Sequence, residues 1–168
     1  MANAIARTLR HLFPRSARAL YPEASLQRIA AAIAAGESTH RGEICFAVES
    51  SMPVLAVFSG YDVRVRAREV FAQLQVWDTA ANNGVLLYLL LADHCIEIVA
   101  DRGLDKLVSA EQWRGVCQLV EERLKAGEPE AAALQGVAAI SALLAGHFPR
   151  TQGVRDRNEL PDLPRILD

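Results

Sequence analysis

Oxygen-bearing side chains gather where several predicted strands begin or end. Four of them form the centre of a candidate metal site: Asp78, Asn83, Glu97 and Asp101. Glu97 and Asp101 are four residues apart on one predicted strand, so both carboxylates leave the same face of the sheet. Carboxylate and backbone carbonyl oxygens are the ligands that Ca²⁺ and Mg²⁺ take in proteins. The sequence therefore predicts a divalent-cation site for calcium or magnesium.

Four neighbouring residues extend this candidate site: Asn82, Gly84, Glu43 and Arg102. The Asn-Asn-Gly run also has a simpler explanation, because asparagine and glycine tolerate positive φ and shape turns. The acids are equally explained as solvated side chains or as partners of nearby arginines, namely Arg41, Arg66 and Arg102. No EF-hand loop is present, so the cation site and the structural explanation both stay open.

The sequence contains no recognised catalytic motif. It has no Walker loop, dinucleotide-binding fingerprint, G-x-S-x-G or H-E-x-x-H. Cys117 and Arg123 have the Cys-x5-Arg spacing of a phosphate loop, but they lie inside a predicted helix whose backbone N–H groups are already bonded. The 4 histidines are scattered and form no helical zinc pair. The sequence alone therefore discloses no reaction.

Periodicity predicts the elements that position these residues. Helices are expected over residues 3–13, 22–35, 63–75, 109–126 and 129–145, and strands over 43–50, 85–92 and 95–101. The first strand alternates and reads as half-buried, whereas Val85–Ala92 is apolar almost throughout and should be covered on both faces. A helix between the first two strands predicts a parallel pair, and the two-residue link Asp93-His94 predicts an antiparallel one. Residues 51–62 lack a clear period and are expected to form a loop.

This order of elements predicts an α/β fold, a three-layer sandwich in which a small mixed β-sheet is flanked by helices on both faces. The domain is expected to span residues 21–149, after an N-terminal helical arm (1–20) and before an extended C-terminal tail (150–168). The arm repeats apolar residues at helical spacing (Ile5, Leu9, Leu12). Two explanations fit it: a helix docked on the core or on a neighbouring chain, and an arm on a membrane surface.

Charge and composition narrow the cellular setting. A net charge of -2 gives no electrostatic reason to expect nucleic acid as a partner. We find no continuous apolar run of the ~18 residues that would span a bilayer and no secretory signal. Three widely spaced cysteines without a C-x-x-C pair suit a reducing compartment. We expect a cytoplasmic protein, with an organelle transit peptide as the alternative raised by the arginines of the first twenty residues.

The segment Ala67–Leu104 resembles the core of the TPM domain family. The matching pieces are Phe71, Trp77, the run Asn83-Gly84-Val85-Leu86, the run Ile96-Glu97-Ile98, and Gly103-Leu104. The order of elements matches this family from about residue 22 to 148. His147-Phe148-Pro149 and the run from Asn158 to Asp162 resemble the ends of short bacterial members without a signal peptide.

The resemblance implies two functions. Plant thylakoid relatives are linked to photosystem II repair, with acid phosphatase activity and calcium binding, and some bacterial relatives occur beside LemA-like membrane proteins. The chain is therefore expected to be an accessory or interaction module, modulated by a divalent metal and working with a LemA-like or membrane-anchored TPM protein. The alternative is a divalent-metal-dependent acid phosphatase that uses Asp78, Asn83, Glu97 and Asp101. Ser109-Ala110 stands where many members carry Asp-Ala, which weakens the transfer of a metal site.

Overall fold

A computed structural model describes residues 2–150 and 158–167 of the chain, with backbone only for residues 2–4. Within these residues the sheet has four strands: β1 (Glu43–Glu49), β2 (Gly84–Leu90), β3 (Cys95–Ala100) and β4 (Arg165–Leu167). Their order across the sheet is β3-β2-β1-β4. β1 runs parallel to β2 and β4, and β3 pairs antiparallel with β2. The predicted mixed sheet and both predicted pairings are confirmed.

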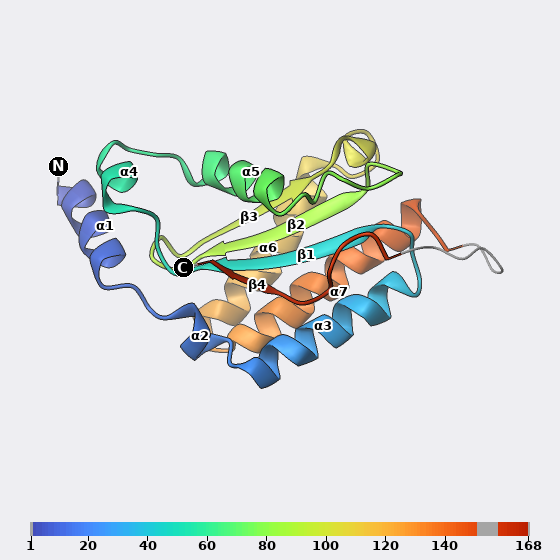
Figure 1. The fold of residues 1–168 in the computed structure, drawn as a ribbon, viewed down its shortest axis with the longest axis horizontal. Coiled ribbons are helices and arrows are strands. Elements are labelled where there is room, and N and C mark those ends of the chain that lie inside the picture. The colour runs from blue at the N-terminus through green and yellow to red at the C-terminus, as the bar shows by residue number, and fades with distance from the viewer. Residues whose placement is uncertain (1, 151–157, 168) are drawn as a thin grey trace.

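Helices cover both faces of this sheet (Figure 1). On one face lie α3 (Glu23–Glu37), α6 (Ala110–Lys125) and α7 (Pro129–His147). On the other face lies α5 (Val63–Gln73), with Val57 of the short helix α4 (Val54–Phe58) packed into the same apolar cluster. The three-layer α/β sandwich is therefore the observed architecture.

The core fills the space between the layers on each side of β1 and β2. Phe46 and Leu87 pack with the helices of the three-helix face, and Leu86 and Tyr88 pack with Val70 of α5. The half-buried assignment of the first strand was wrong, since every residue of β1 is buried. The alternation of polar and apolar residues predicted a solvent-facing side that does not exist, because Glu43 and Glu49 of β1 bind protein partners rather than water.

Several segments differ from their predicted form. A helix, α4, occupies part of the stretch expected to be a loop, and a four-residue helix, α2 (Ala17–Leu20), follows α1 (Ala2–Leu12). The end of the expected tail forms β4, whose three residues pair with Ala47–Glu49 of β1. Residues 151–157 of that tail lie outside the described part of the chain. These elements are too short to produce a period in the sequence, and their partners define them.

Helix α7 is, among the described helices, the one long and apolar enough to cross a membrane, with a mean hydropathy of 1.2 over its 18-residue window. The search for an uninterrupted apolar run missed it, because polar residues such as Glu130 and Gln135 break the run. The helix packs between α3 and α6 and against β1 and β2. A third of that window is buried inside the protein, 33%.

Candidate functional site

The ends of three strands meet where β1 and β2 begin. Glu43 lies opposite Gly84 in the sheet register, and the Asp101 N–H donates to the Gly84 carbonyl at 2.9 Å. We call this edge the amino-end rim, formed by Glu43, Asn82, Asn83, Gly84, Asp101 and Arg102. Gly84 is required there, because a Cβ at this position would lie 1.9 Å from the Val76 carbonyl oxygen.

A chain of hydrogen bonds fixes one side of the rim. Asp101 Oδ1 accepts from the Arg102 N–H at 2.7 Å and so caps the short 3₁₀ turn η1 (Arg102–Leu104). Arg102 Nε donates to Asn82 Oδ1 at 2.9 Å, and the Asn82 carbonyl accepts from the Gly103 N–H at 2.9 Å. Asn82 has a φ of 51°, a left-handed conformation that asparagine tolerates. Asn82 therefore shapes a turn and also lies in the rim.

Two buried oxygen atoms in the rim have no hydrogen-bond partner among the described residues. Asn83 is fully buried. Its backbone N–H donates to Thr79 Oγ1 at 3.0 Å, and its Nδ2 donates to the Arg41 carbonyl at 2.7 Å. Its Oδ1 is left without a donor, and so is Asp101 Oδ2. Buried acceptors are nearly always satisfied by protein, water or an ion. The two oxygens are therefore the part of the rim that fits a cation or a water.

Glu43, in contrast, is engaged with the C-terminal segment. Its two carboxylate oxygens accept the backbone N–H groups of Glu159 and Leu160, each at 3.2 Å. The neighbouring Glu37 accepts the Ile44 N–H at 3.0 Å. Burial, with the nearby charge of Glu43, raises the pKa of Glu37 to about 8. Glu37 therefore keeps its proton to a higher pH than an exposed glutamate does. Glu43 holds the C-terminal segment through its two hydrogen bonds.

The other two predicted ligands lie apart from the unpartnered oxygens. Asp78 is exposed in the loop between α5 and β2. Glu97 lies opposite Tyr88 in the middle of β3 and pairs with Arg64 Nη1 at 2.9 Å. Four residues of a strand span about 13 Å, so sharing a face does not bring Glu97 to Asp101. Within the described residues, no three His, Cys, Asp or Glu side chains converge as a metal group. The donors that fit a cation are thus one carboxylate and one amide, and backbone carbonyls or water would have to complete them.

The opposite end of the sheet carries a second polar centre, which the sequence did not reveal. Asp93, in the β2–β3 turn, pairs with Arg7 Nη2 at 2.7 Å and with His11 Nε2 at 3.1 Å. Although burial acts in the other direction, the hydrogen bonds from Arg7 and His11 lower the pKa of Asp93. His11 Nδ1 accepts the Met52 N–H at 3.0 Å, and Nε2 lies on the side of Asp93. This centre ties α1 to the body of the protein.

Nearby, a buried ion pair ends β1. Arg66 Nη2 of α5 lies 2.9 Å from Glu49 Oε1, and the Tyr88 hydroxyl donates to the same carboxylate. The glutamate side chain is only 6% exposed. The structural explanation given for the acids, pairing with arginine, therefore holds for Glu49 and Arg66.

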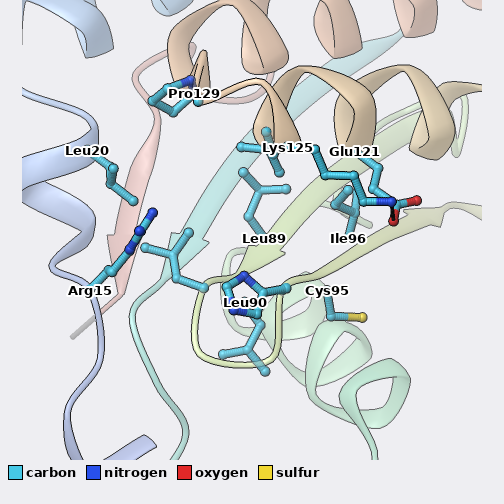
Figure 2. A pocket seen from close by; sticks show the side chains of 13 residues that line it. Arg15, Leu20, Leu89, Leu90, Cys95, Ile96, Glu121, Lys125 and Pro129 are labelled. Atoms are coloured by element: carbon cyan, nitrogen blue, oxygen red, sulfur yellow. Dashed lines mark ion pairs between the residues drawn. The ribbon is translucent and has the colours of Figure 1, made fainter. Parts of the chain in front are cut away.

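An apolar cavity of about 380 Å³ opens at this same end of the sheet (Figure 2). It lies between the α1–α2 link, the β2–β3 turn and the α6–α7 turn. Its walls are mostly apolar, with Leu20, Leu89, Ile96, Leu124 and Pro129 among them. Three basic side chains also line it, Arg15, His94 and Lys125, together with the acidic Glu121. Lys125 is paired with Glu121 at 2.6 Å, whereas Arg15 and His94 make no side-chain hydrogen bond or ion pair within the described residues. Sequence reasoning missed this cavity because its walls come from segments that are distant along the chain.

Comparison with known proteins places this geometry in a wider group. The sequence profile of the TPM domain matches residues 17–143. A similar solved structure is the NMR structure of the BA42 protein from the psychrophilic bacterium Bizionia argentinensis, with a TM-score of 0.74 and 27% sequence identity. The similarity covers 84% of this chain and 92% of that one. Among curated proteins, none matches the chain.

Proposed function

Because this chain belongs to the TPM domain family, we propose that it is an accessory interaction module that works in the cytoplasm with a membrane-protein partner. The observation that carries this proposal is the apolar cavity at the carboxyl end of β2 (Figure 2). Open α/β sheets bind ligands outside the carboxyl ends of their strands. Its volume of about 380 Å³ lies within the range of ligand pockets.

The lining of the cavity indicates what part of a partner would enter it. The walls offer apolar contact, and Arg15 and His94 offer unpaired polar groups among the described residues. A segment that carries a bulky apolar side chain beside a carboxylate matches both features. We propose that such a segment of a LemA-like or membrane-anchored TPM protein is the partner's contact.

Filling the cavity tests this proposal. Ile96→Trp and Leu124→Trp each place an indole in the space that the partner would use, whereas Leu119→Trp adds the same group on an exposed position of α6. The detergent-solubilised partner is expected to co-purify with the wild type and with Leu119→Trp, and to be lost at least tenfold with the two cavity variants. A thermal melt confirms that each variant is folded. Equal recovery with a folded cavity variant would refute the cavity as the contact.

We propose further that a divalent cation, Ca²⁺ or Mg²⁺, modulates the module at the amino-end rim. The support is the pair of buried oxygens without a donor, Asn83 Oδ1 and Asp101 Oδ2. When bound, the cation would supply positive charge to these two acceptors. Glu43 in the same rim holds Glu159 and Leu160, so occupancy of the rim would act on the C-terminal segment.

A melt with and without cation tests the rim. At a concentration ten times Kd, binding stabilises the folded state by about 1.4 kcal/mol, which corresponds to a rise in Tm of roughly 3–5 °C. Asp101→Asn keeps the Oδ1 acceptor that caps η1 but removes the charge, and it should abolish the rise. Glu97→Gln, whose parent carboxylate pairs with Arg64, should keep it. No rise at millimolar Ca²⁺ or Mg²⁺, or a rise that survives Asp101→Asn, would refute the cation site.

The alternative function, a divalent-metal-dependent acid phosphatase, requires Asp78, Asn83, Glu97 and Asp101 around one metal. The ion pair of Glu97 with Arg64 and the exposed position of Asp78 favour the accessory function over this one. Hydrolysis of a generic aryl phosphate with Mg²⁺ or Ca²⁺, lost in Asp78→Ala, would reverse that order. Activity that is absent or unchanged in Asp78→Ala would remove the alternative.

A further inference from the structure

Helix α1 is docked with its polar side toward the protein and its apolar side toward solvent. Arg7, Arg10 and His11 contact the body, and His11 is buried. The outward stripe is apolar, with exposed fractions of 61% for Ile5, 51% for Leu9 and Leu12, and 83% for Phe13. An amphipathic helix of a globular protein normally buries its apolar stripe in the core. This orientation is the reverse.

Specific polar contacts hold the helix in the reversed orientation. Arg7 pairs with Asp93 and also donates to the Tyr61 carbonyl at 3.1 Å, and Arg10 Nε donates to the Ala92 carbonyl at 2.8 Å. With His11 against Asp93, three successive inward positions of α1 are engaged. Because these polar contacts fix the inward side of α1, its apolar stripe faces solvent. An exposed apolar surface of this kind marks an interaction site.

Helix α4 lies against α1 and adds to the same end of the molecule (Figure 1). Its Leu55 and Phe58 are 83% and 75% exposed. We call the exposed apolar side chains of the two helices the α1–α4 face: Ile5, Leu9, Leu12, Phe13, Leu55 and Phe58. Two phenylalanines and four aliphatic side chains in solvent are the composition of a helix face that enters the interface of a bilayer.

The charge around the α1–α4 face distinguishes a membrane from a second copy of the chain. Residues 1–22 contain four arginines and no acidic residue. Arg7 and Arg10 are turned toward Asp93 and the Ala92 carbonyl. Arg15, exposed directly after the face, makes no hydrogen bond or ion pair within the described part of the chain. An isologous dimer through this face would bring the Arg15 side chains of both copies to one interface, where their like charges repel. Anionic lipid attracts Arg15, by about 1 kcal/mol for an arginine near the surface.

We propose that the α1–α4 face docks the protein on an anionic membrane surface. The apolar stripe enters the headgroup region, and Arg15 meets lipid phosphates. Interfacial helices of this kind rely on both apolar burial and attraction to anionic lipid. The inference extends the proposed function by setting the module against the membrane in which its partner lies.

Vesicle co-sedimentation of the full chain tests this proposal, with EDTA present so that the rim takes no part. The probes are vesicles of phosphatidylglycerol and phosphatidylcholine, and vesicles of phosphatidylcholine alone. The wild type is expected to sediment with the anionic vesicles only, and Arg15→Gln to bind about fivefold more weakly. The double variant Leu9→Ser/Phe13→Ser should lose binding at least tenfold. Its matched control, Leu107→Ser/Leu119→Ser, removes two exposed leucines elsewhere and should bind like the wild type.

The outcomes distinguish membrane docking from loss of folding and from dimerisation. Because Leu9 and Phe13 are exposed, their serine variant should melt like the wild type, which separates lost binding from lost folding. Failure of the wild type to bind anionic vesicles would overturn the proposal, as would binding that survives Leu9→Ser/Phe13→Ser. A wild-type dimer in sedimentation velocity that becomes monomeric in that variant, without vesicle binding, would assign the face to a second copy instead. None of these results bears on the cation melt or on the cavity variants.

Discussion

Glu37, the last residue of α3, is expected to make the protein less stable as the pH rises from about 5 to about 8. Burial and the charges of Glu43 and Asp162 raise its pKa from 4.5 to about 8. Between these two values the unfolded chain has released the proton and the folded chain still holds it. The folded state then binds more protons, so the free energy of unfolding falls as pH rises through this window and levels off above it.

The magnitude follows from the shift and from the exposure of the side chain. A rise from 4.5 to about 8 corresponds to roughly 5 kcal/mol at full strength. Glu37 is only half-buried, so solvent screens part of this term, and we expect about 2 kcal/mol. Glu37→Gln keeps an oxygen to accept the Ile44 N–H but carries no proton to release. The variant should therefore gain about 2 kcal/mol over the wild type between about pH 5 and about pH 8.5.

Urea unfolding followed by tryptophan fluorescence at several pH values measures this difference. Glu23→Gln, at an exposed position of the same helix, controls for the loss of one carboxylate. A gap between Glu37→Gln and the wild type that stays constant from about pH 5 to about pH 8.5 would show that Glu37 is not protonated in the folded state. The account of Glu37 as a half-buried acid that keeps its proton beside Glu43 would then fail.

Three further changes should alter stability or local opening in directions that the packing dictates. Gly136→Ala places a Cβ within 2.8 Å of two core side chains and should lower the free energy of unfolding by about 1–3 kcal/mol. Gly115→Ala, in open space on α6, should instead raise it by about 0.5–1 kcal/mol. Urea unfolding compares the two variants. Arg66→Met leaves a buried carboxylate unpaired and should cost about 3 kcal/mol, against near zero for the exposed Arg68→Met in the same assay. Asp93→Asn weakens the contacts that dock α1, so trypsin should cleave within α1 several-fold faster than in the wild type, and an unchanged cleavage rate would contradict that role.

The sequence predicted the parts of the fold that local patterns encode. The apolar run beginning at Val85 and the two-residue link after it were enough to predict a buried strand and an antiparallel neighbour. Period-two geometry predicted that Glu97 and Asp101 leave the same face of the sheet. The pattern could not predict that Glu97 pairs with Arg64, 33 residues earlier in the chain, while Asp101 lies at the rim.

The remaining features depend on partners that are distant in sequence. The periodicity of α1 predicted an apolar stripe but not the direction it would face, because that is decided by Asp93, 86 residues from Arg7. The cavity depends on the meeting of three separate turns, each of which looks ordinary by itself. The buried state of β1 depends on Arg66 and on β4, whose three residues leave no signal of their own.

The pairing of β4 with β1 has a consequence for how the protein keeps itself apart from its copies. Where Ile166 and its neighbours lie along Ala47–Glu49, they occupy backbone groups that would otherwise form an open strand edge. Such edges recruit strands from other molecules. β4 therefore covers Ala47–Glu49 and presents only three residues as the new edge, and its loss would leave this part of β1 open to strands from other molecules.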